Sequence, residues 1–402
     1  MTNIKVVIGA NFGDEGKGLM TDYFSHQALS NKEDCVVVLA NGGAQRGHTV
    51  TDSNGAQHVF HHFGAGSLAG ASTYCTSEYI LNPMTYVKEY FDLIKLGYTP
   101  TPVYIEHTCR WSTPFDMIAN QIIEASREDK KHGSCGMGIW ETVVRYERRP
   151  KSPSLFMFNV MAREHKQAYL KELRDVYLPN RLKEEGIASI PAEWAEIVNS
   201  DVLIEHFIDD VAFMVNHAQL STKKPLNTFK NIVFENGQGL LLDQNQTFYG
   251  NNTTPSATGS FNAIKSINQY FYNTTDEVNV EMCYVTRTYM TRHGVGRFET
   301  ECDKSLINEA MFDETNITNK FQDNLRYGKL ILPNLVTRVS SDFAQALANN
   351  QNKSKIKLTA NIAVTHTNEY EIDYARLRDQ LISGVYVSDS RTRDSVKIFT
   401  DF

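Results

Sequence analysis

The chain has 402 residues, 41% hydrophobic and 22% charged, which is typical of a folded globular protein with a large core. Its formal net charge of −7 argues against a nucleic-acid-binding surface, and no apolar run reaches membrane-spanning length. The six cysteines are scattered without a CxxC pair, and the N-terminus enters a strand directly. We therefore expect a cytoplasmic protein with reduced thiols, no zinc site, no signal peptide, and no nucleic-acid or membrane partner.

The first predicted element is a buried strand that ends in a glycine-rich turn. The apolar run covers residues 4–8, the turn 13–18 reads GDEGKG, and a helix is predicted from Met20 onward. Such a turn offers unpaired backbone N–H groups and a helix N-terminus, which favour a bound phosphate. Lys17 adds a mobile positive charge. The segment predicts a nucleotide-binding, P-loop-like strand–loop–helix unit, with a plain surface turn as the alternative.

The turn departs from a standard P-loop, in which four residues separate the first glycine from a Gly-Lys pair that a Ser or Thr follows. Gly9 lies too far from Gly16, and Gly18 stands where the hydroxyl group would be. Another oxygen must therefore hold a metal ion, and Asp14 is the nearest candidate. A carboxylate would repel phosphate in such a cradle unless a cation or the chemistry requires it.

Apolar strand-like runs alternate with helical patterns along the rest of the chain. Strands are predicted at 36–39, 103–106, 231–234, 285–289 and 356–364, and helices at 116–130, 163–178 (ended by Pro179) and around 204–215. This order predicts an α/β fold: a largely parallel central sheet with helices on both faces, elaborated by inserted helices, in a single domain over residues 1–402. Ligands of open α/β sheets bind outside the carboxyl ends of the strands, so we expect the polar loops there to converge on one crevice.

Taken in order, several of these loops resemble those of the adenylosuccinate synthetases. The matching segments are Gly13–Gly18, Gly42-Gly43 followed by Gly47-His48-Thr49, Glu235–Gly239, and Thr291-Arg292 through Thr300-Glu301. The resemblance runs from Ile4 to about Ile398 and is clear only at the loops. It implies a homodimeric ligase that joins L-aspartate to C6 of a purine nucleoside monophosphate, after phosphorylation of the 6-oxo group.

The resemblance implies catalytic roles for three side chains. Asp14 would remove the N1 proton of the purine, and His48 would stabilise negative charge on O6 by donating a hydrogen bond or proton. Lys17 would offset charge on the transferring phosphoryl group. The cofactor Mg²⁺ would be held by Asp14 and the Gly47 carbonyl. Taken alone, His48 is equally well explained as a structural histidine in a turn.

The other implied positions surround the three substrates. The donor nucleotide would contact Gly13, Glu15, Gly16, Lys17, Gly18, Gly47, Thr49 and Asn368. The purine monophosphate and L-aspartate would contact Asp14, Gln45, Ser134, Cys135, Arg149, Gln238, Asn252, Thr253, Arg292, Thr300 and Arg326.

Five of these positions carry alternatives or departures. Ser134 and Cys135 stand where the family has paired threonines, and a thiol is the poorer donor. Arg149 would cross a dimer interface to the neighbour's phosphate; a solvated charge cluster with Arg148 is the alternative. The family has an arginine-rich run in the aspartate-binding loop, and this chain keeps fewer of those arginines. Arg326 is the best remaining partner for a substrate carboxylate, because its planar fork can bind bidentately. The family's glutamine at the position of Gln238 contacts the purine base. The simpler explanation for Gln238 is a hydrogen bond within its own loop.

One loop changes the expected phosphoryl donor. Family members that use GTP have Thr-Lys-x-Asp where this chain has Thr365-His366-Thr367-Asn368. A carboxylate only accepts, as guanine requires, whereas Asn368 can accept from adenine N6–H and donate to N1. Losing the charge-assisted bond to guanine would cost about 1.5–3 kcal/mol.

We therefore predict ATP or dATP as donor. This departure makes the chain most similar to the viral 2-aminoadenylosuccinate synthetases, which act on dGMP. The nearer alternative is an enzyme that uses IMP and GTP, and the more distant one a non-catalytic nucleotide-binding regulator.

Overall fold

The computed structural model describes residues 1–127, 133–250, 252–311 and 325–399. Within these ranges ten strands form one sheet in the order β17-β16-β15-β11-β1-β10-β2-β5-β7-β9. Neighbouring strands are parallel throughout, except that β17 runs antiparallel to β16. The strands are β1 (Thr2–Gly9), β2 (Cys35–Leu39), β5 (Ser72–Cys75), β7 (Val103–Ile105), β9 (Ala218–Leu220), β10 (Asn231–Gly239), β11 (Val278–Arg287), β15 (Ile356–Thr365), β16 (Gly384–Val387) and β17 (Lys397–Phe399). The predicted largely parallel sheet is confirmed.

Strand β1 lies between β10 and β11, and both of its faces are covered. A continuous apolar run suits a strand that is buried on both sides. Val7 belongs to the core that includes α1 (Lys17–Ser30), while Val6 and Ile8 belong to the core that includes α10 (Phe261–Phe271) and α12 (Leu332–Asn349). Helices therefore cover both faces of the sheet, as predicted.

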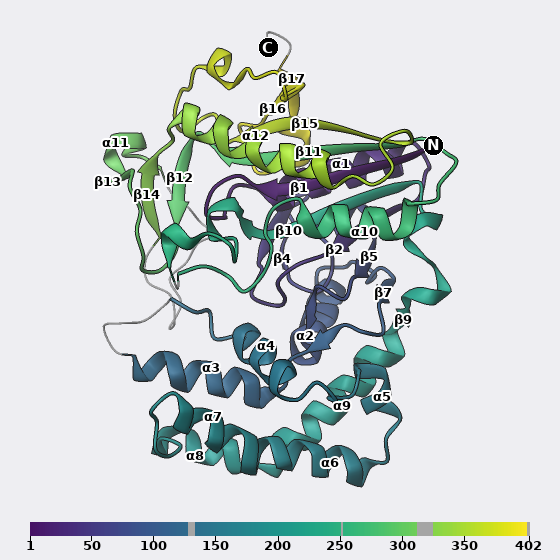
Figure 1. Ribbon diagram of the computed structural model, residues 1–402, viewed down its shortest axis with the longest axis vertical. Helices are drawn as coiled ribbons and strands as arrows, with labels where there is room; N and C mark the ends of the chain where they lie inside the picture. The colour runs from purple at the N-terminus through teal and green to yellow at the C-terminus, as the bar shows by residue number, and fades with distance from the viewer. Residues whose placement is uncertain (128–132, 251, 312–324, 400–402) are drawn as a thin grey trace.

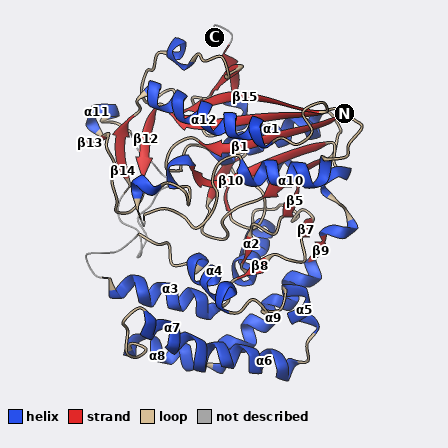
Figure 2. Cartoon of the chain, viewed as in Figure 1, coloured by secondary structure: helices blue, strands red, loops and turns tan. Residues whose placement is uncertain are grey.

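The inserted helices form a layer of their own beneath the sheet (Figures 1 and 2). In the sequence these helices come between β7 and β9, although the two strands are hydrogen-bonded neighbours in the sheet. They are α3 (Pro114–Ser126), α4 (Ile139–Arg148), α5 (Leu155–Val160), α6 (Arg163–Glu172), α7 (Leu178–Glu184), α8 (Ala192–Asn199) and α9 (Asp201–His217). Helix α2 (Pro83–Lys95) packs against α9 through the same core as α1.

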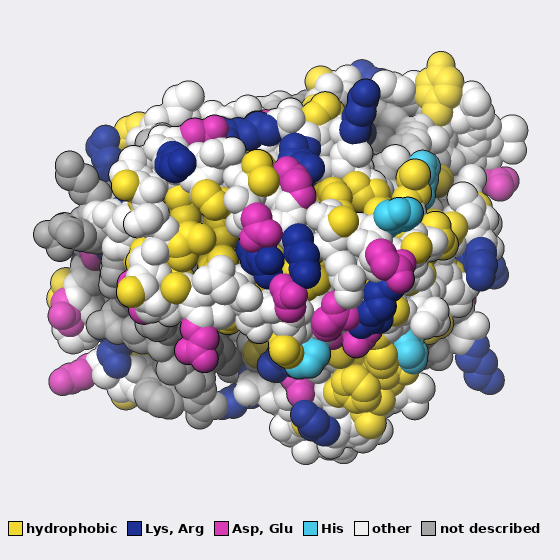
Figure 3. Space-filling model, turned by 90° about the horizontal axis from the view of Figure 1, so that it is seen from below, with side chains coloured by type: hydrophobic (Ala, Val, Ile, Leu, Met, Phe, Trp, Pro, Cys, Tyr) yellow, Lys and Arg dark blue, Asp and Glu magenta, His cyan; other side chains and the backbone are white. Residues whose placement is uncertain are grey.

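Seen from below, the molecule shows basic and acidic side chains intermixed over one face (Figure 3). Ion pairs such as Arg163–Glu205 and Lys171–Asp201 link α6 to α9. Among the described residues, no helix is long and apolar enough to cross a membrane.

Two helix predictions need correction. Helix α1 begins at Lys17 rather than Met20, because Gly16 adopts a left-handed conformation and forms the N-cap. Pro179 does not end a helix: a π-helical turn at Leu173–Tyr177 precedes it, and α7 runs through it. The wider π turn lets the chain carry a residue without a backbone N–H. The helix predicted at 116–130 is observed as α3, and its predicted last residues lie outside the described ranges.

Some predicted loops are strands instead. Gly239 still pairs with Gly9 of β1, so β10 continues well past its apolar part. His48 and Thr49 begin β3 (His48–Thr51), which forms a hairpin with β4 (Gln57–Phe60). A three-stranded sheet contains β12 (Tyr289–Arg292), β13 (Glu301–Cys302) and β14 (Arg326–Lys329), beside the short α11 (Ser305–Asn308), and β6 (Ile80–Leu81) pairs with β8 (Arg110–Trp111). Backbone pairing holds these polar segments in place, and side-chain patterns do not reveal it. The assignment of residues 1–402 to a single domain stays a prediction.

Candidate active site

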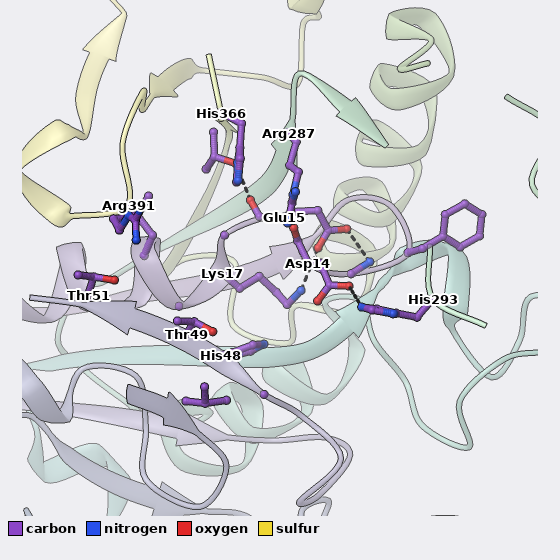
Figure 4. Close-up of a pocket in the computed structure, with 18 of the residues that line it drawn as sticks. Asp14, Glu15, Lys17, His48, Thr49, Thr51, Arg287, His293, His366 and Arg391 are labelled. Atoms are coloured by element: carbon purple, nitrogen blue, oxygen red, sulfur yellow. Dashed lines mark hydrogen bonds and ion pairs between the residues drawn. The ribbon is translucent and has the colours of Figure 1, made fainter. Parts of the chain in front are cut away.

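A cavity of about 600 Å³ opens at the carboxyl ends of the central strands. Its walls include segments that follow five consecutive strands of the sheet, β15, β11, β1, β10 and β2. The predicted site residues among them are Gly13, Asp14, Glu15, Gly16, Lys17, Gly18, Gln45, Gly47, His48, Thr49, Gln238 and Asn368 (Figure 4 shows part of the lining). The expected convergence of loops on one crevice is confirmed for these positions.

Glu15 organises the glycine loop from within. Its Oε1 accepts hydrogen bonds from the backbone N–H groups of Asn11 (2.9 Å) and Gly13 (2.8 Å), and its Oε2 accepts one from Lys17 Nζ (2.9 Å). Both charged side chains are 2% exposed. Glu15 thus fixes the ammonium group of Lys17 at the end of the loop, where the start of α1 adds favourable dipole potential for an anion.

Gly18 explains why this loop lacks the hydroxyl residue of a P-loop. A Cβ at Gly18 would lie 2.8 Å from the carbonyl oxygen of Thr49 and 3.2 Å from Cβ of His48. The first turn of α1 is therefore in direct contact with β3, and only glycine fits between them. This contact places the glycine loop and His48 on one cavity.

The carboxylate of Asp14 is charged and held in place. The backbone of Asp14 is left-handed (φ 59°), and its carbonyl oxygen accepts a hydrogen bond from Arg287 Nε. Its Oδ2 lies 3.2 Å from Nε2 of His293 (Figure 4). Burial raises the pKa of Asp14, but the hydrogen bond from His293 and the positive charges of His293, Arg287 and Lys17 lower it below its ordinary value. Asp14 is therefore ionised at neutral pH, as a general base or metal ligand must be.

A buried ion pair holds His48. Nδ1 of His48 donates to Oε1 of Glu235 (2.5 Å), and the guanidinium of Arg46 lies 2.6 Å from Oε2 of Glu235. Burial raises the pKa of Glu235, but Arg46 and His48 lower it to about 2. Burial lowers the pKa of His48 to about 4, against the attraction of Glu235. The ring is thus neutral with its proton on Nδ1, and Nε2 is left for a ligand.

Two side-chain amides supply unpaired groups to the inner part of the cavity. Gln45 Nε2 donates to Oγ1 of Thr254 (3.3 Å), while Oε1 of Gln45 and Oε1 of Gln238 are buried without a hydrogen-bond partner among the described residues. Both amides lie within 4 Å of the position of a Cβ on Gly42, so they are close together. Buried polar atoms normally have partners, so these oxygens indicate a place where a ligand binds.

Three residues of the predicted base-recognition loop, Thr365, His366 and Asn368, line the cavity. Oγ1 of Thr365 donates to the carbonyl oxygen of Glu15 (2.7 Å), which joins this loop to the glycine loop. Asn368 is exposed and donates to Oε1 of Glu369 (3.1 Å). His366 is left-handed (φ 56°), as are Asp14 and Gln238, and all three line the cavity. Such backbone conformations in non-glycine residues cluster at functional sites.

The remaining predicted substrate contacts lie outside the cavity walls. They are Ser134, Cys135, Arg149, Asn252, Thr253, Arg292, Thr300 and Arg326. Arg149 pairs with Glu172 and lies over the rings of Tyr169 (5.8 Å) and Tyr177 (6.0 Å). Ser134 donates to Asn120, Thr253 to the Gly250 carbonyl, and Thr300 to the sulfur of Met290. Their substrate roles stay predictions.

Arg326, predicted to bind the substrate carboxylate, and Arg292, a predicted substrate contact, both hold one loop. Arg326 forms an ion pair with Glu301 and donates to the carbonyl oxygens of Gly294 (3.1 Å) and Gly296 (2.8 Å). Arg292 lies over the ring of Phe12 (4.5 Å) and donates to carbonyl oxygens of Asn252 (3.3 Å) and Arg297 (2.5 Å). The acceptors of both guanidinium groups thus belong to the chain itself.

Four functional side chains were not assigned from the sequence: Arg46, Glu235, Arg287 and His293. Arg46, Glu235 and His293 stand inside the motif segments that follow predicted strands, and that position was the available signal. Their partners are distant in sequence; Glu235 and His48, for example, are 187 positions apart. The fold was needed to identify these pairs.

The site offers few metal ligands of its own. No group of three or more His, Cys, Asp or Glu side chains in the described ranges could hold a metal ion. Asp14 and the carbonyl of Gly47, both in the cavity walls, are oxygen donors of the kind that Mg²⁺ prefers. Magnesium usually takes only one or two protein ligands besides water and phosphate oxygens, so these residues fit a nucleotide-bound Mg²⁺.

Known proteins resemble this chain in sequence. A family model for adenylosuccinate synthetase matches residues 6–355. The adenylosuccinate synthetase of Picosynechococcus sp. is 30% identical over 316 residues, which cover 76% of this chain and 64% of that protein. The enzyme of Prochlorococcus marinus subsp. pastoris is 29% identical over 318 residues, which cover 78% of this chain and 67% of that protein. The match to the first of these relatives thus spans less than two thirds of its length.

Solved structures share the fold. The fully ligated adenylosuccinate synthetase of Plasmodium falciparum has a TM-score of 0.69 at 15% identity, with 99% of this chain and 100% of that chain covered. The succinoaminodeoxyadenylate synthetase of cyanophage S-2L, bound to dGMP and dATP, has a TM-score of 0.61 at 13% identity, with 99% and 95% covered. The family model spans most of the sequence, and the chain therefore belongs to the adenylosuccinate synthetase family.

Proposed function

We propose that this protein is a C–N ligase that joins the amino group of L-aspartate to C6 of a purine nucleoside monophosphate, with phosphoryl transfer from a nucleoside triphosphate. One observation carries the proposal. The glycine loop with Lys17, the carboxylate of Asp14 and the imidazole of His48 line one cavity at the carboxyl ends of the central strands. Family membership supports the same reaction.

In the first step, O6 of the purine attacks the γ-phosphorus of the donor, and the bond to the β-phosphate oxygen breaks. Asp14 accepts the N1 proton as charge moves to O6. Lys17 and the start of α1 bind the phosphate oxygens. His48 faces O6 through Nε2; after taking a second proton from solvent it donates a hydrogen bond to that oxygen, and Glu235 balances the imidazolium. In the second step, the amino group of aspartate attacks C6, the C6–O6 bond breaks, and phosphate leaves with the O6 oxygen and takes up the proton that the amino group loses.

Asp14 and the Gly47 carbonyl would hold a Mg²⁺ ion bound with the nucleotide. When bound, the ion neutralises negative charge on the phosphates. Glu15 already accepts hydrogen bonds from two backbone N–H groups and from Lys17, so we assign it a structural role in shaping the loop. Asp14, rather than Glu15, is left to contact the ligand.

For the substrates, dGMP with ATP or dATP is our first choice. Asn368 supports an adenine donor, because it lines the outer end of the cavity and can both donate and accept. A further support is the fold shared with the cyanophage enzyme bound to dGMP and dATP. IMP with GTP is the second candidate, which the curated adenylosuccinate synthetases favour by sequence similarity.

The test is product formation by the purified protein with L-aspartate, Mg²⁺ and each pairing of IMP or dGMP with GTP, ATP or dATP. We expect succinylated product from dGMP with ATP or dATP. Turnover of IMP with GTP alone would exclude dGMP and leave the ligase assignment intact. Nucleotide binding without turnover of any pairing would favour a regulator and end the ligase proposal.

We also propose a homodimer in which Arg149 reaches the monophosphate of the neighbouring subunit. Arg149 would have to leave Glu172, and that pair is partly exposed (30% and 40%), so the exchange costs little. Sedimentation analysis of the wild type should show a dimer. Steady-state kinetics of Arg149→Leu should show a raised KM for the monophosphate. Unchanged kinetics would remove Arg149 from the site.

A further inference from the structure

The proposed base contacts an imidazole from a distant part of the chain. Asp14 follows β1, whereas His293 follows β12, yet Oδ2 of Asp14 and Nε2 of His293 are 3.2 Å apart (Figure 4). Both residues line the cavity, and their side chains are 30% and 24% exposed. The contact therefore lies at the surface of the proposed site, not in the core.

This contact fixes one oxygen of the carboxylate. Within the described part of the chain, Oδ2 of Asp14 has the His293 contact and Oδ1 has no hydrogen bond. A carboxylate with one oxygen hydrogen-bonded loses rotational freedom about its single bonds, and its second oxygen is presented in a defined direction. Oδ1 is then the atom that a purine N1–H can meet.

His293 itself is well positioned. The segment that it begins, residues 293–297, is tied down by the bonds from Arg326 to the carbonyls of Gly294 and Gly296, and by the bond from Arg292 to the carbonyl of Arg297. The backbone of Gly294 (φ 68°) and Gly296 (φ 109°) is left-handed, so the turn depends on glycine. The imidazole thus projects from an anchored turn.

We propose that His293 is a positioning residue for the first chemical step: its Nε2–H holds Asp14 so that Oδ1 takes the N1 proton. The inference rests on the proposed function, which gives Asp14 that role. It also connects the two steps of the reaction, because Arg326, which is predicted to bind aspartate, holds the segment that carries His293.

The test compares three variants of the full-length protein in the substrate pairing that the wild type turns over. In His293→Gln, the amide nitrogen lies near the place of Nε2 and still donates, but it does not take up a second proton. His293→Ala removes the donor. Arg297→Ala is the matched control, since this exposed side chain in the same segment contacts Phe248 and Glu299 outside the cavity.

We expect His293→Ala to lower kcat about 10- to 100-fold, the usual effect of losing a partner that orients a reactive group. The KM for the donor should stay unchanged, His293→Gln should keep most of the wild-type kcat, and Arg297→Ala should match the wild type. Positional isotope exchange in the labelled donor, measured without aspartate, should fall in parallel with kcat, which places the loss in the first step.

The outcomes separate the two proposals. A wild type that turns over no pairing ends the proposed function. A wild type that is active, with His293→Ala equally active or with His293→Gln as impaired as His293→Ala, overturns the positioning role. A thermal unfolding midpoint close to wild type for His293→Gln ensures that its kinetics report on the site.

Discussion

The two halves of the proposed site differ in how far folding alone assembles them. In the glycine-loop half, Lys17 and His48 are held by the carboxylates of Glu15 and Glu235, which are at most 2% exposed. In the arginine half, Arg326 and Arg149 are bound to the partly exposed carboxylates of Glu301 and Glu172, away from the cavity. One half is ready for a ligand, and the other is engaged with the protein itself.

The difference between the two halves follows from how deeply their charged and polar side chains are buried. A buried charge or polar group without a partner is too costly to leave, so the ammonium of Lys17 and the neutral ring of His48 both have fixed partners in the fold. An exposed ion pair contributes about 0–1 kcal/mol, so an anionic ligand can replace the carboxylate that an arginine holds. The glycine-loop half is thus set by the fold, while the arginine half is expected to rearrange on binding.

The largest expected effect comes from removing the reacting carboxylate of the glycine-loop half. Asp14→Ala should lower kcat about 10²- to 10⁴-fold, because the purine loses the acceptor of its N1 proton. Donor binding should persist, since Lys17 and the start of α1 remain. Steady-state kinetics and titration with a fluorescent donor analogue measure the two effects, and full product formation by the variant would refute the catalytic role.

The next prediction concerns the stability of that half. Glu235→Ala should lower the free energy of unfolding by about 3–5 kcal/mol, because Arg46 is left as a buried, unpaired charge. Asp92→Ala is the control: its partners Lys88 and Lys95 are 78% and 75% exposed, so the loss should stay within about 1 kcal/mol. Urea unfolding compares them, and equal losses would contradict the contrast in burial.

The third prediction tests whether the arginine half turns towards the ligand. Arg326→Lys keeps the charge but removes the planar fork, so the KM for L-aspartate should rise about tenfold or more. The KM for the nucleotide donor should not change. A variant with wild-type affinity for aspartate would show that Arg326 serves only Glu301 and the 293–297 turn.

The smallest expected effect concerns the choice of donor at the outer end of the cavity. Asn368→Asp restores an acceptor-only side chain, so the ratio of kcat/KM for ATP to that for GTP should fall about tenfold. Competition assays with both donors measure the ratio, and wild-type protein is the reference. An unchanged ratio would mean that Asn368 does not contact the base.

Sequence patterns predicted the parts that depend on local chemistry. The apolar run of β1, its glycine turn and the buried stripe of α9 were recognisable because burial and helix periodicity leave clear signals. The polar continuation of β10 through Glu235 was missed, since backbone pairing with β1 and not its side chains makes it a strand. Pro179 was wrongly predicted to end a helix, because the π turn that precedes it lets the helical chain continue through a proline.

The same division holds for the site. Asp14, Lys17 and His48 could be predicted because they stand in short motifs next to strand ends. The pairs Asp14–His293 and Glu235–Arg46 could not, because they join segments that only the sheet order brings together. The arginines could be listed as carboxylate or phosphate ligands, but their present partners depend on which acceptor is nearest in the folded chain.

The path of the chain through the helical layer has an evolutionary consequence. The chain leaves the sheet after β7 and re-enters it at β9, where Val103 pairs with Ala218, so the excursion starts and finishes on adjacent strands. Three strands, β10, β2 and β5, separate β7 from β1, whose turn carries the proposed base. This part of the chain can therefore diverge in length or sequence while the strand order that positions the proposed base is kept.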